Sequence, residues 1–415
     1  MAILQGMLGL AVLLAIAFVL SEKRRDISPR VVLAGLLLQI GLALLLIKFP
    51  PAKAVFYMLN DAVAALHKAT EAGTSLVFGY LGGAPLPFVE TQPGASYILA
   101  FQAFPLVLVM SALVSLLIHW GILQRIVGAF AWGLRHTIGI GGALGLGAAV
   151  HIFVGMIEAP LIVRPYLKTM ARGELFALMS CGMAGIAGTV MIIYASFLGS
   201  IIPDALGNLL IASVISTPAA LVVASIMVPF ASDPDAKVHL SVDDPLASFM
   251  EAIARGTNDG VGLLAGILAM LVVLIALVTL VNSCLGLIPH DGTDPLTLQR
   301  IFAFGFRPIM WLIGIPGPEL EAAANLMSTK TVLNEFVAFL DLSHLPPEAL
   351  SPHSRLIMTY ALCGFANFGS LGIMIGGLTN MAPERKHEIV ALAPRSLVSG
   401  TIATCMSGAM VGMIG

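Results

Sequence analysis

Charged residues are scarce in this sequence. Asp, Glu, Lys and Arg make up 11% of its 415 residues, whereas soluble domains carry about 25%. Hydrophobic residues make up 58%. A chain of this composition cannot cover a soluble surface, and we expect an all-α polytopic membrane protein.

Sequence signals for bound metals and nucleotides are also lacking. The four cysteines (Cys181, Cys284, Cys363 and Cys405) have no CxxC or Cys/His spacing, so buried free thiols are expected rather than disulfides or zinc. No Gly-Lys-Ser/Thr phosphate loop or basic tract occurs, and the formal net charge is −2. We therefore expect no cofactor and no nucleic-acid partner.

Long apolar runs dominate what remains, and about 20 apolar residues cross a bilayer. The first run lacks a leading basic region and a small-residue cleavage site, so we interpret it as a retained helix. The runs predict eight spans at 2–21, 31–49, 97–120, 174–199, 204–230, 260–288, 353–379 and 388–413. Amphipathic segments predict interfacial helices at 54–72, 121–137, 246–258 and 298–314.

The basic cluster Lys23-Arg24-Arg25 follows the first run directly. Lys and Arg beside a span belong on the cytoplasmic side. With eight spans, both termini are then predicted to lie outside.

Two further apolar stretches carry a carboxylate each and contain Pro or Gly. They cover 140–168 with Glu158 and 317–345 with Glu335. A carboxylate within the membrane is costly and marks a functional site. Broken backbone is tolerated there only where it is buried in protein or lines a cavity. We therefore predict two re-entrant hairpins.

An internal repeat relates the two hairpins. Four matches occur in one order: LQRI at 123 and 298, IGIGG at 138 with IGIPG at 313, Glu158 with Glu335, and CGMAG at 181 with CGFAN at 363. Three predicted spans separate the hairpins, so the second copy should be inverted, as in secondary transporters. The predicted units are 1–120 (scaffold), 121–230 (first repeat), 231–297 (cytoplasmic linker, interfacial helix and span) and 298–415 (second repeat).

The repeat brings polar residues together near the membrane midplane. Glu158 and Glu335 would meet with Asn367 and Ser370 around one cavity. Carboxylates and an amide suit a hydroxyl-rich ligand, because a carboxylate accepts hydrogen bonds and Asn both donates and accepts. The alternative is that the glutamates pair with Lys330, or that contacts between helices satisfy the polar set.

The motifs GMIEAPLIVRP at 155–165, NEFVAF at 334–339 and CGFANFGS at 363–370 resemble the concentrative nucleoside transporter family, and the similarity covers nearly the whole chain. The resemblance implies the fold of that family, with eight transmembrane helices, two re-entrant hairpins and an inverted repeat. It also implies a homotrimer in the inner membrane that imports nucleosides by Na⁺ or H⁺ symport with an elevator mechanism.

Site residues follow from the same resemblance. Glu335, Asn367 and Ser370 match positions that hold the ribose hydroxyls, and Glu158 matches a hairpin glutamate beside the base. The matches to apolar residues near the base are Val190 and Phe365. At two positions where the family has Gln and Thr or Ser, this chain has Met156 and Ile157, which predicts weakened recognition of the base.

The family's Na⁺ site corresponds to His151, Val154, Gly185 and Ile186. The family has Asn at the first position and Ser at the third. Two side-chain oxygens are thus lost, and an imidazole that titrates near neutral pH replaces one of them. The hypothesis is that no standard Na⁺ site remains and that protons couple through His151 or Glu158.

Other functions remain open at this point. The fold could carry another ribosylated or polyhydroxylated substrate, which Met156 and Ile157 favour, or it could be an uncoupled nucleoside uniporter. An enzyme is not expected, because no nucleophile or metal-ligand constellation accompanies the two glutamates.

Overall fold

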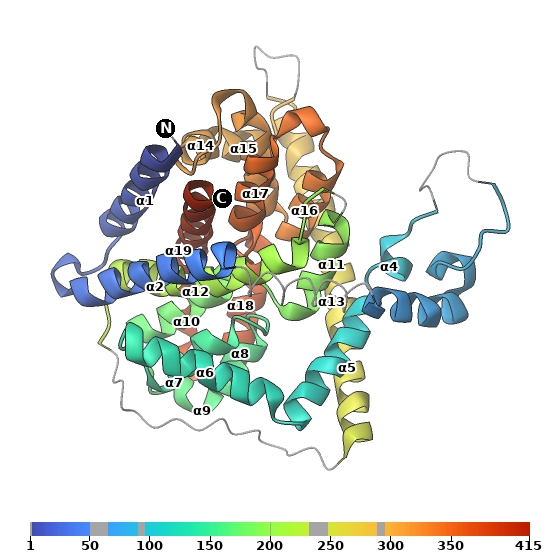
Figure 1. Ribbon diagram of the computed structural model, residues 1–415, viewed down its shortest axis with the longest axis horizontal. Coiled ribbons are helices and arrows are strands. Elements are labelled where there is room, and N and C mark those ends of the chain that lie inside the picture. Colours follow the sequence, from blue (N-terminus) through green and yellow to red (C-terminus); the bar gives the residue numbers. More distant parts are fainter. Residues whose placement is uncertain (1, 50–64, 90–95, 200, 232–247, 289–294) are drawn as a thin grey trace.

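The computed structural model describes residues 2–49, 65–89, 96–199, 201–231, 248–288 and 295–415. The described residues are nearly all helical and contain no strand. Figure 1 shows the helices gathered around α12, α17 and α19, with α4 and its neighbours projecting to one side. The prediction of an all-α protein is confirmed.

The helices in the first half are α1 (Ala2–Val19), α2 (Pro29–Lys48), a helix over 65–78, α4 (Leu99–Gln102), α5 (Leu106–His119), α6 (Ile122–Thr137), α7 (Gly142–Val150), α8 (Glu158–Ile162), α9 (Arg164–Leu167), α10 (Arg172–Ala184), α11 (Gly188–Leu198) and α12 (Ala205–Met227). Those in the second half are α13 (Phe249–Leu285), α14 (Leu298–Leu312), α15 (Leu320–Val332), α16 (Glu335–His344), α17 (Pro352–Leu362), α18 (Phe368–Met381) and α19 (Lys386–Ile414).

Six helical segments of the described chain are long and apolar enough to cross a membrane. They are Pro29–Lys48, Leu99–His119, Arg172–Leu198, Ala205–Met227, Phe249–Leu285 and Pro383–Ile414. A shorter apolar helix covers Ile3–Val19. The α17–α18 pair is interrupted between Leu362 and Phe368. The count of eight spans stays a prediction.

The two sequence copies fold in the same order. Each begins with an amphipathic helix (α6 or α14), continues through a hairpin (α7–α8 or α15–α16) and a broken helix (α10–α11 or α17–α18), and ends in a long helix (α12 or α19). In Figure 1 the first hairpin lies at one end of the molecule and the second enters from the other. The copies are therefore arranged in opposite directions, as the inverted repeat predicts.

Side-chain caps set several helix starts in the second half. The side chains of Ser248, Thr297 and Ser351 accept hydrogen bonds from backbone N–H groups at the starts of α13, α14 and α17. These N–H groups have no partner within the helix, so each cap removes an unsatisfied donor.

One helix differs from its prediction. Separate elements were expected at 246–258 and 260–288, but α13 runs without interruption over Phe249–Leu285. Gly256 and Gly260 lie against α5, where a Cβ on Gly256 would come within 2.6 Å of the Ser111 carbonyl oxygen. These glycines therefore allow close helix packing and do not end a helix.

Two predicted segments lie partly outside the described residues. They are the cytoplasmic linker, of which residues 232–247 are not described, and the interfacial helix at 54–72, of which residues 54–64 are not described. Among the described helices, α1 and α2 pack against α19 and α12, whereas α5 packs against α13. The division into four units, with its three internal boundaries, stays a prediction.

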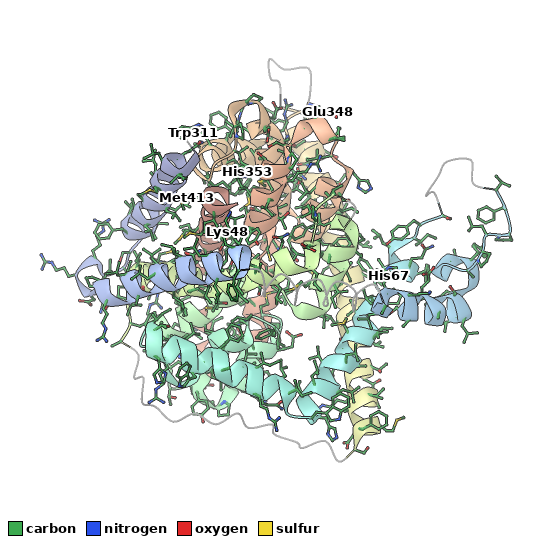
Figure 2. All side chains as sticks on the ribbon, in the orientation of Figure 1. Lys48, His67, Trp311, Glu348, His353 and Met413 are labelled. Carbon is green, nitrogen blue, oxygen red and sulfur yellow. The ribbon has the colours of Figure 1, made fainter. Side chains whose placement is uncertain are left out.

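The chain termini share one end of the molecule. Gln5 donates a hydrogen bond to the Trp311 carbonyl, and Gly6 lies beside Met413. Figure 1 marks both ends of the chain there, and Figure 2 places Trp311, His353, Glu348 and Met413 toward the same end.

An ion-pair network joins the α1–α2 connection to α10 and α19. Glu22, between α1 and α2, accepts from Arg172 at 2.9 Å and pairs with Arg395 at 3.1 Å. Arg172 also pairs with Glu388 at 3.7 Å. Arg385 donates to the carbonyls of Leu167 and Met170, both at 2.7 Å, where the first hairpin ends.

We expect Glu22→Gln to lower thermal stability in a pH-dependent way. The hydrogen bonds from Arg172 lower the pKa of the Glu22 carboxyl. The stabilisation is thus present above the unfolded glutamate pKa of about 4.3 and is lost as the pH falls through the lower folded value. Exposed pairs contribute up to about 1 kcal/mol each. Thermal unfolding in detergent should show the largest deficit at pH 7 and a smaller one below pH 4. An equal deficit at both values would contradict this, and Glu348→Gln is the control.

Candidate functional site

A cavity of about 330 Å³ lies where the hairpins and the broken helices meet. One side is formed by residues at the start of α8, on α11, at the start of α16 and on α18. The long helix α13 forms the opposite wall, from Gly262 to Leu274. Most of the lining is apolar, and the polar groups sit at the ends of short helices.

Glu335 is the main buried acid of the cavity. It is 5% exposed and is the first residue of α16, after Asn334, whose side chain caps the helix by accepting from the Val337 N–H at 3.0 Å. Tyr194 Oη donates to Glu335 Oε1 at 2.8 Å, and Asn367 Nδ2 donates to Oε2 at 2.9 Å. A buried carboxylate needs such donors, because desolvation otherwise disfavours its charge.

Asn367 has two roles at the α17–α18 break. Its amide oxygen accepts from the Ser370 N–H at 2.7 Å and so caps α18, while its amide nitrogen donates to Glu335. Ser370 lines the cavity and is 6% exposed. The amide and the carboxylate are therefore preorganised, because the cap fixes the Asn367 side chain, and Ser370 lies on the same cavity wall.

Glu158 lies at the start of α8 and also lines the cavity. Its side chain is exposed to the cavity, and it lies close to Gly155, where a Cβ would overlap the carboxylate. Within the described part of the chain, no hydrogen bond or ion pair involves this carboxylate. It is therefore available to accept from a ligand.

Lys330 does not pair with either glutamate, although the sequence allowed it. This fully buried lysine donates to the Ala361 carbonyl at 2.8 Å and to Thr404 Oγ1 at 3.1 Å. Ala361 is in the last turn of α17, where carbonyls lack partners within the helix. Lys330 therefore attaches the second hairpin to the end of α17 and to α19.

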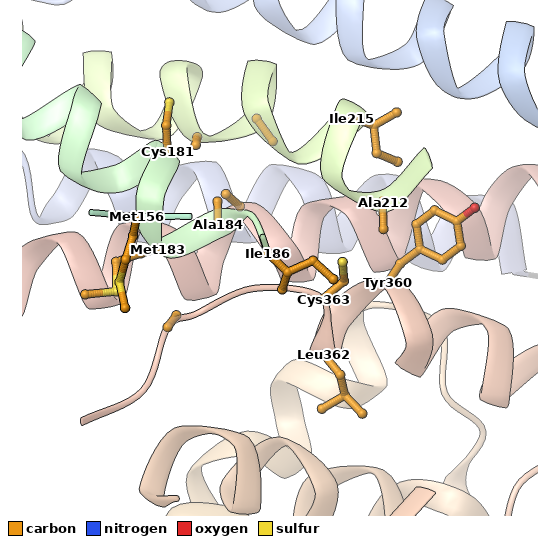
Figure 3. Close-up of a cluster of buried hydrophobic side chains, with 14 of the residues drawn as sticks. Met156, Cys181, Met183, Ala184, Ile186, Ala212, Ile215, Tyr360, Leu362 and Cys363 are labelled. Carbon is orange, nitrogen blue, oxygen red and sulfur yellow. The ribbon is translucent and has the colours of Figure 1, made fainter. Parts of the chain in front are cut away.

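The two broken helices cross at their breaks. The Phe365 N–H donates to the Gly185 carbonyl at 3.2 Å. A Cβ on Gly364 would lie 3.0 Å from both the Met183 and Ala184 carbonyl oxygens. Figure 3 shows the apolar packing here, with Met183, Ala184 and Ile186 on one break and Leu362 and Cys363 on the other.

The residues predicted to couple an ion lie beside the cavity and do not line it. His151 is 3% exposed, and its Nε2 atom has no hydrogen-bond partner. Its carbonyl oxygen would lie 3.2 Å from a Cβ on Gly185, and the Phe153 carbonyl accepts from the Gly188 N–H at 3.0 Å. The bend of the first hairpin, including Val154, is thus packed against the α10–α11 break that contains Gly185 and Ile186.

The cavity brings together all the residues predicted to bind substrate, which are Met156, Ile157, Glu158, Val190, Glu335, Phe365, Asn367 and Ser370. Their individual roles stay predictions. Sequence reasoning missed Tyr194, Phe336 and the α13 wall. A tyrosine within an apolar run was the available signal for Tyr194, because a buried phenol usually finds a partner.

Within the described residues, no group of three or more His, Cys, Asp or Glu side chains is placed to hold a metal ion. The polar groups of the cavity are hydrogen-bond acceptors and amide or hydroxyl groups. They are suited to holding a polar organic molecule without covalent chemistry.

Comparisons with known proteins agree on one family. Residues 8–81 and 208–412 match the models for the N-terminus and C-terminus of the Na⁺-dependent nucleoside transporter, and residues 100–201 match a nucleoside recognition model. An uncharacterized transporter of Haemophilus influenzae is 36% identical over 100% of this chain and 98% of its own length. Sodium/nucleoside cotransporter 2 of Rattus norvegicus is 32% identical over 98% of this chain, which spans 62% of that protein.

Solved structures agree as well. The structure of CNTnw in an inward-facing substrate-bound state superposes with a TM-score of 0.89, at 32% identity and with 100% of both chains covered. The aligned region includes all the residues that line the cavity.

We expect Gly364→Ala to destabilise the protein where the broken helices cross. The added methyl group would meet two carbonyl oxygens at 3.0 Å and Thr404 Cγ2 at 2.7 Å. Overpacking of this kind costs about 1–3 kcal/mol. Gly372→Ala in α18 is the matched control, because a Cβ there meets nothing within 4 Å. Thermal unfolding in detergent should show a lower midpoint for Gly364→Ala than for Gly372→Ala, and equal midpoints would contradict the crossing.

Proposed function

This chain belongs to the concentrative nucleoside transporter family, and we propose that it imports nucleosides across the inner membrane together with a cation. The relatives are transporters and not enzymes, which confirms the prediction of a non-enzymatic role.

The main support for nucleoside binding is the cluster of Glu335, Asn367 and Ser370 on the wall of the cavity. A ribose presents two adjacent hydroxyl groups. One can donate to the carboxylate while the amide and the serine hydroxyl exchange hydrogen bonds with the other. Tyr194 donates a hydrogen bond to the Glu335 carboxylate and so acts as a positioning residue.

The rest of the cavity supports a base site of low polarity. Glu158 supplies an acceptor, and its neighbours Met156 and Ile157 supply no side-chain donor. Nitrogen-bound hydrogens of a base could donate to Glu158, while Val190 and Phe365 offer apolar contact. The same lining favours one second candidate, a polyhydroxylated substrate with a different apolar group in place of the base.

We expect Glu335→Gln to reduce nucleoside uptake by about 10- to 100-fold in kcat/KM, because hydrogen bonds to a charged group contribute about 1.5–3 kcal/mol. Tyr194→Phe should have a smaller effect, mainly on KM. The measurement is uptake of radiolabelled uridine and adenosine into proteoliposomes. Glu348→Gln, at an exposed site away from the cavity, is the control. Wild-type protein that takes up no nucleoside under any ion gradient would contradict the proposed function.

The coupling cation is, in this proposal, a proton. The fit to Na⁺ is poor, since Na⁺ requires oxygen ligands. Gly185 and Ile186 bring no side-chain oxygen, and the Gly185 carbonyl already accepts from Phe365. The proposed proton acceptor is His151, a buried imidazole whose Nε2 atom has no hydrogen-bond partner.

We expect uphill uridine uptake driven by a pH gradient, and not by a Na⁺ gradient. His151→Asn should reduce the response to pH, because it removes the titrating nitrogen and adds an amide oxygen. The measurement is proteoliposome uptake with each gradient imposed separately. Uptake that follows Na⁺ alone would overturn proton coupling, and uptake that only equilibrates would identify a uniporter.

The proposal also covers the orientation of the protein in the membrane and the movement that carries the substrate. The end that carries Glu22, Arg172 and Arg385 would face the cytoplasm, because basic connections gather there, and both termini would lie outside. The hairpins and broken helices would move together past α13 in an elevator motion, within a homotrimer. Support for this movement comes from the cavity itself, which lies between α13 and the hairpin elements.

A further inference from the structure

One ridge of α13 forms the wall opposite the hairpins. Its residues are spaced by four along the helix, at Gly262, Gly266, Met270 and Leu274, and all of them line the cavity. Residues spaced in this way form a continuous ridge on a helix. The ridge therefore begins with two residues without side chains and ends with two large ones.

The large end of the ridge lies beside the polar cluster. A Cβ on Gly369 would come within 2.6 Å of Leu274 Cδ1 and 3.7 Å of Met270 Cε. Gly369 directly precedes Ser370 and lies two residues after Asn367, so α13 approaches α18 beside the cluster. No large group can enter between them at this point.

The glycine end is open. A Cβ on Gly262 or Gly266 would meet nothing within 4 Å. Gly256 and Gly260, earlier on the same helix, are tightly packed against Ser111 and its neighbours on α5. The later pair is exposed and lines the cavity, so the space beside it is continuous with the cavity.

Helix geometry gives the distance between the two ends. At a rise of about 1.5 Å per residue, Gly266 lies roughly 6 Å along the axis from Met270, and Gly262 roughly 12 Å. A nucleoside with its ribose at Asn367 and Ser370 would extend its base by about this distance. The open segment therefore lies within reach of the outer part of a base that extends along α13.

We propose that Gly262 and Gly266 form a hollow that admits the second ring of a purine base, so that this face of α13 sets the size of base that the cavity accepts. This inference rests on the proposed function. The missing side chains leave room for a flat apolar ring, whose faces need no hydrogen bonds. A pyrimidine base would leave the hollow empty.

The test uses Gly266→Val and Gly262→Val in proteoliposomes. The ratio of kcat/KM for adenosine to that for uridine should fall about tenfold or more, because small changes in an apolar pocket discriminate by about 10- to 200-fold. Gly266→Ala should give a smaller fall and serves if a valine variant fails to fold. Gly41→Val is the matched control, because this glycine of α2 is equally open and lies outside the cavity.

Three results would overturn the hollow. One is an unchanged ratio in folded variants, and another is an equal loss of both substrates. The third is a wild type that takes up uridine but excludes adenosine, because the hollow would then be unused. Failure of the proposed function is distinguishable, since the wild type would then take up neither nucleoside.

Discussion

The backbone hydrogen bond between the Phe365 N–H and the Gly185 carbonyl joins the two interrupted helices on which the site depends. Each interruption leaves polar backbone groups without helical partners, which is costly in an apolar interior. Crossing the two breaks lets one supply a donor and the other an acceptor. The approach also requires Gly364, since its neighbours are the Met183 and Ala184 carbonyls. The site therefore lies where the two helix interruptions satisfy one backbone donor and one backbone acceptor of each other.

Hairpin 2, formed by α15 and α16, is attached to this crossing at two points of different character. Lys330 donates to the α17 end at Ala361 and is fully enclosed, so that it forms an internal contact away from the cavity lining. Glu335, five positions later, accepts from Asn367 at the cavity wall, where a ligand can compete for the same groups. Lys330 therefore attaches the hairpin to the helices behind it, while Glu335 remains available to bind a ligand. The opposite wall of the cavity is formed by α13 and is apolar. This wall can select among substrates by its shape and not by hydrogen bonds.

Much of the fold could be predicted from the sequence. Apolar runs, the repeat, and the placement of Gly and Pro predicted the hairpins and both broken helices. Two separate elements were predicted where α13 is continuous, because the contacts of Gly256 and Gly260 with α5 become visible only in the folded chain. The pairing of Lys330 could not be predicted either. A buried lysine needs partners, and only the folded chain shows that these are a helix-end carbonyl and Thr404.

Composition, internal period and motifs are properties of the linear chain, and from them follow the class of protein, the two-copy architecture and the residues of the polar cluster. Only the folded chain shows which of those residues share a cavity, that Tyr194 supports Glu335, and that His151 lies beside the cavity and not in its wall. It also decided that two glycines of α13 face open space while two others are packed. The physical reason is that these properties depend on distances between segments far apart in the chain, which short-range preferences do not set.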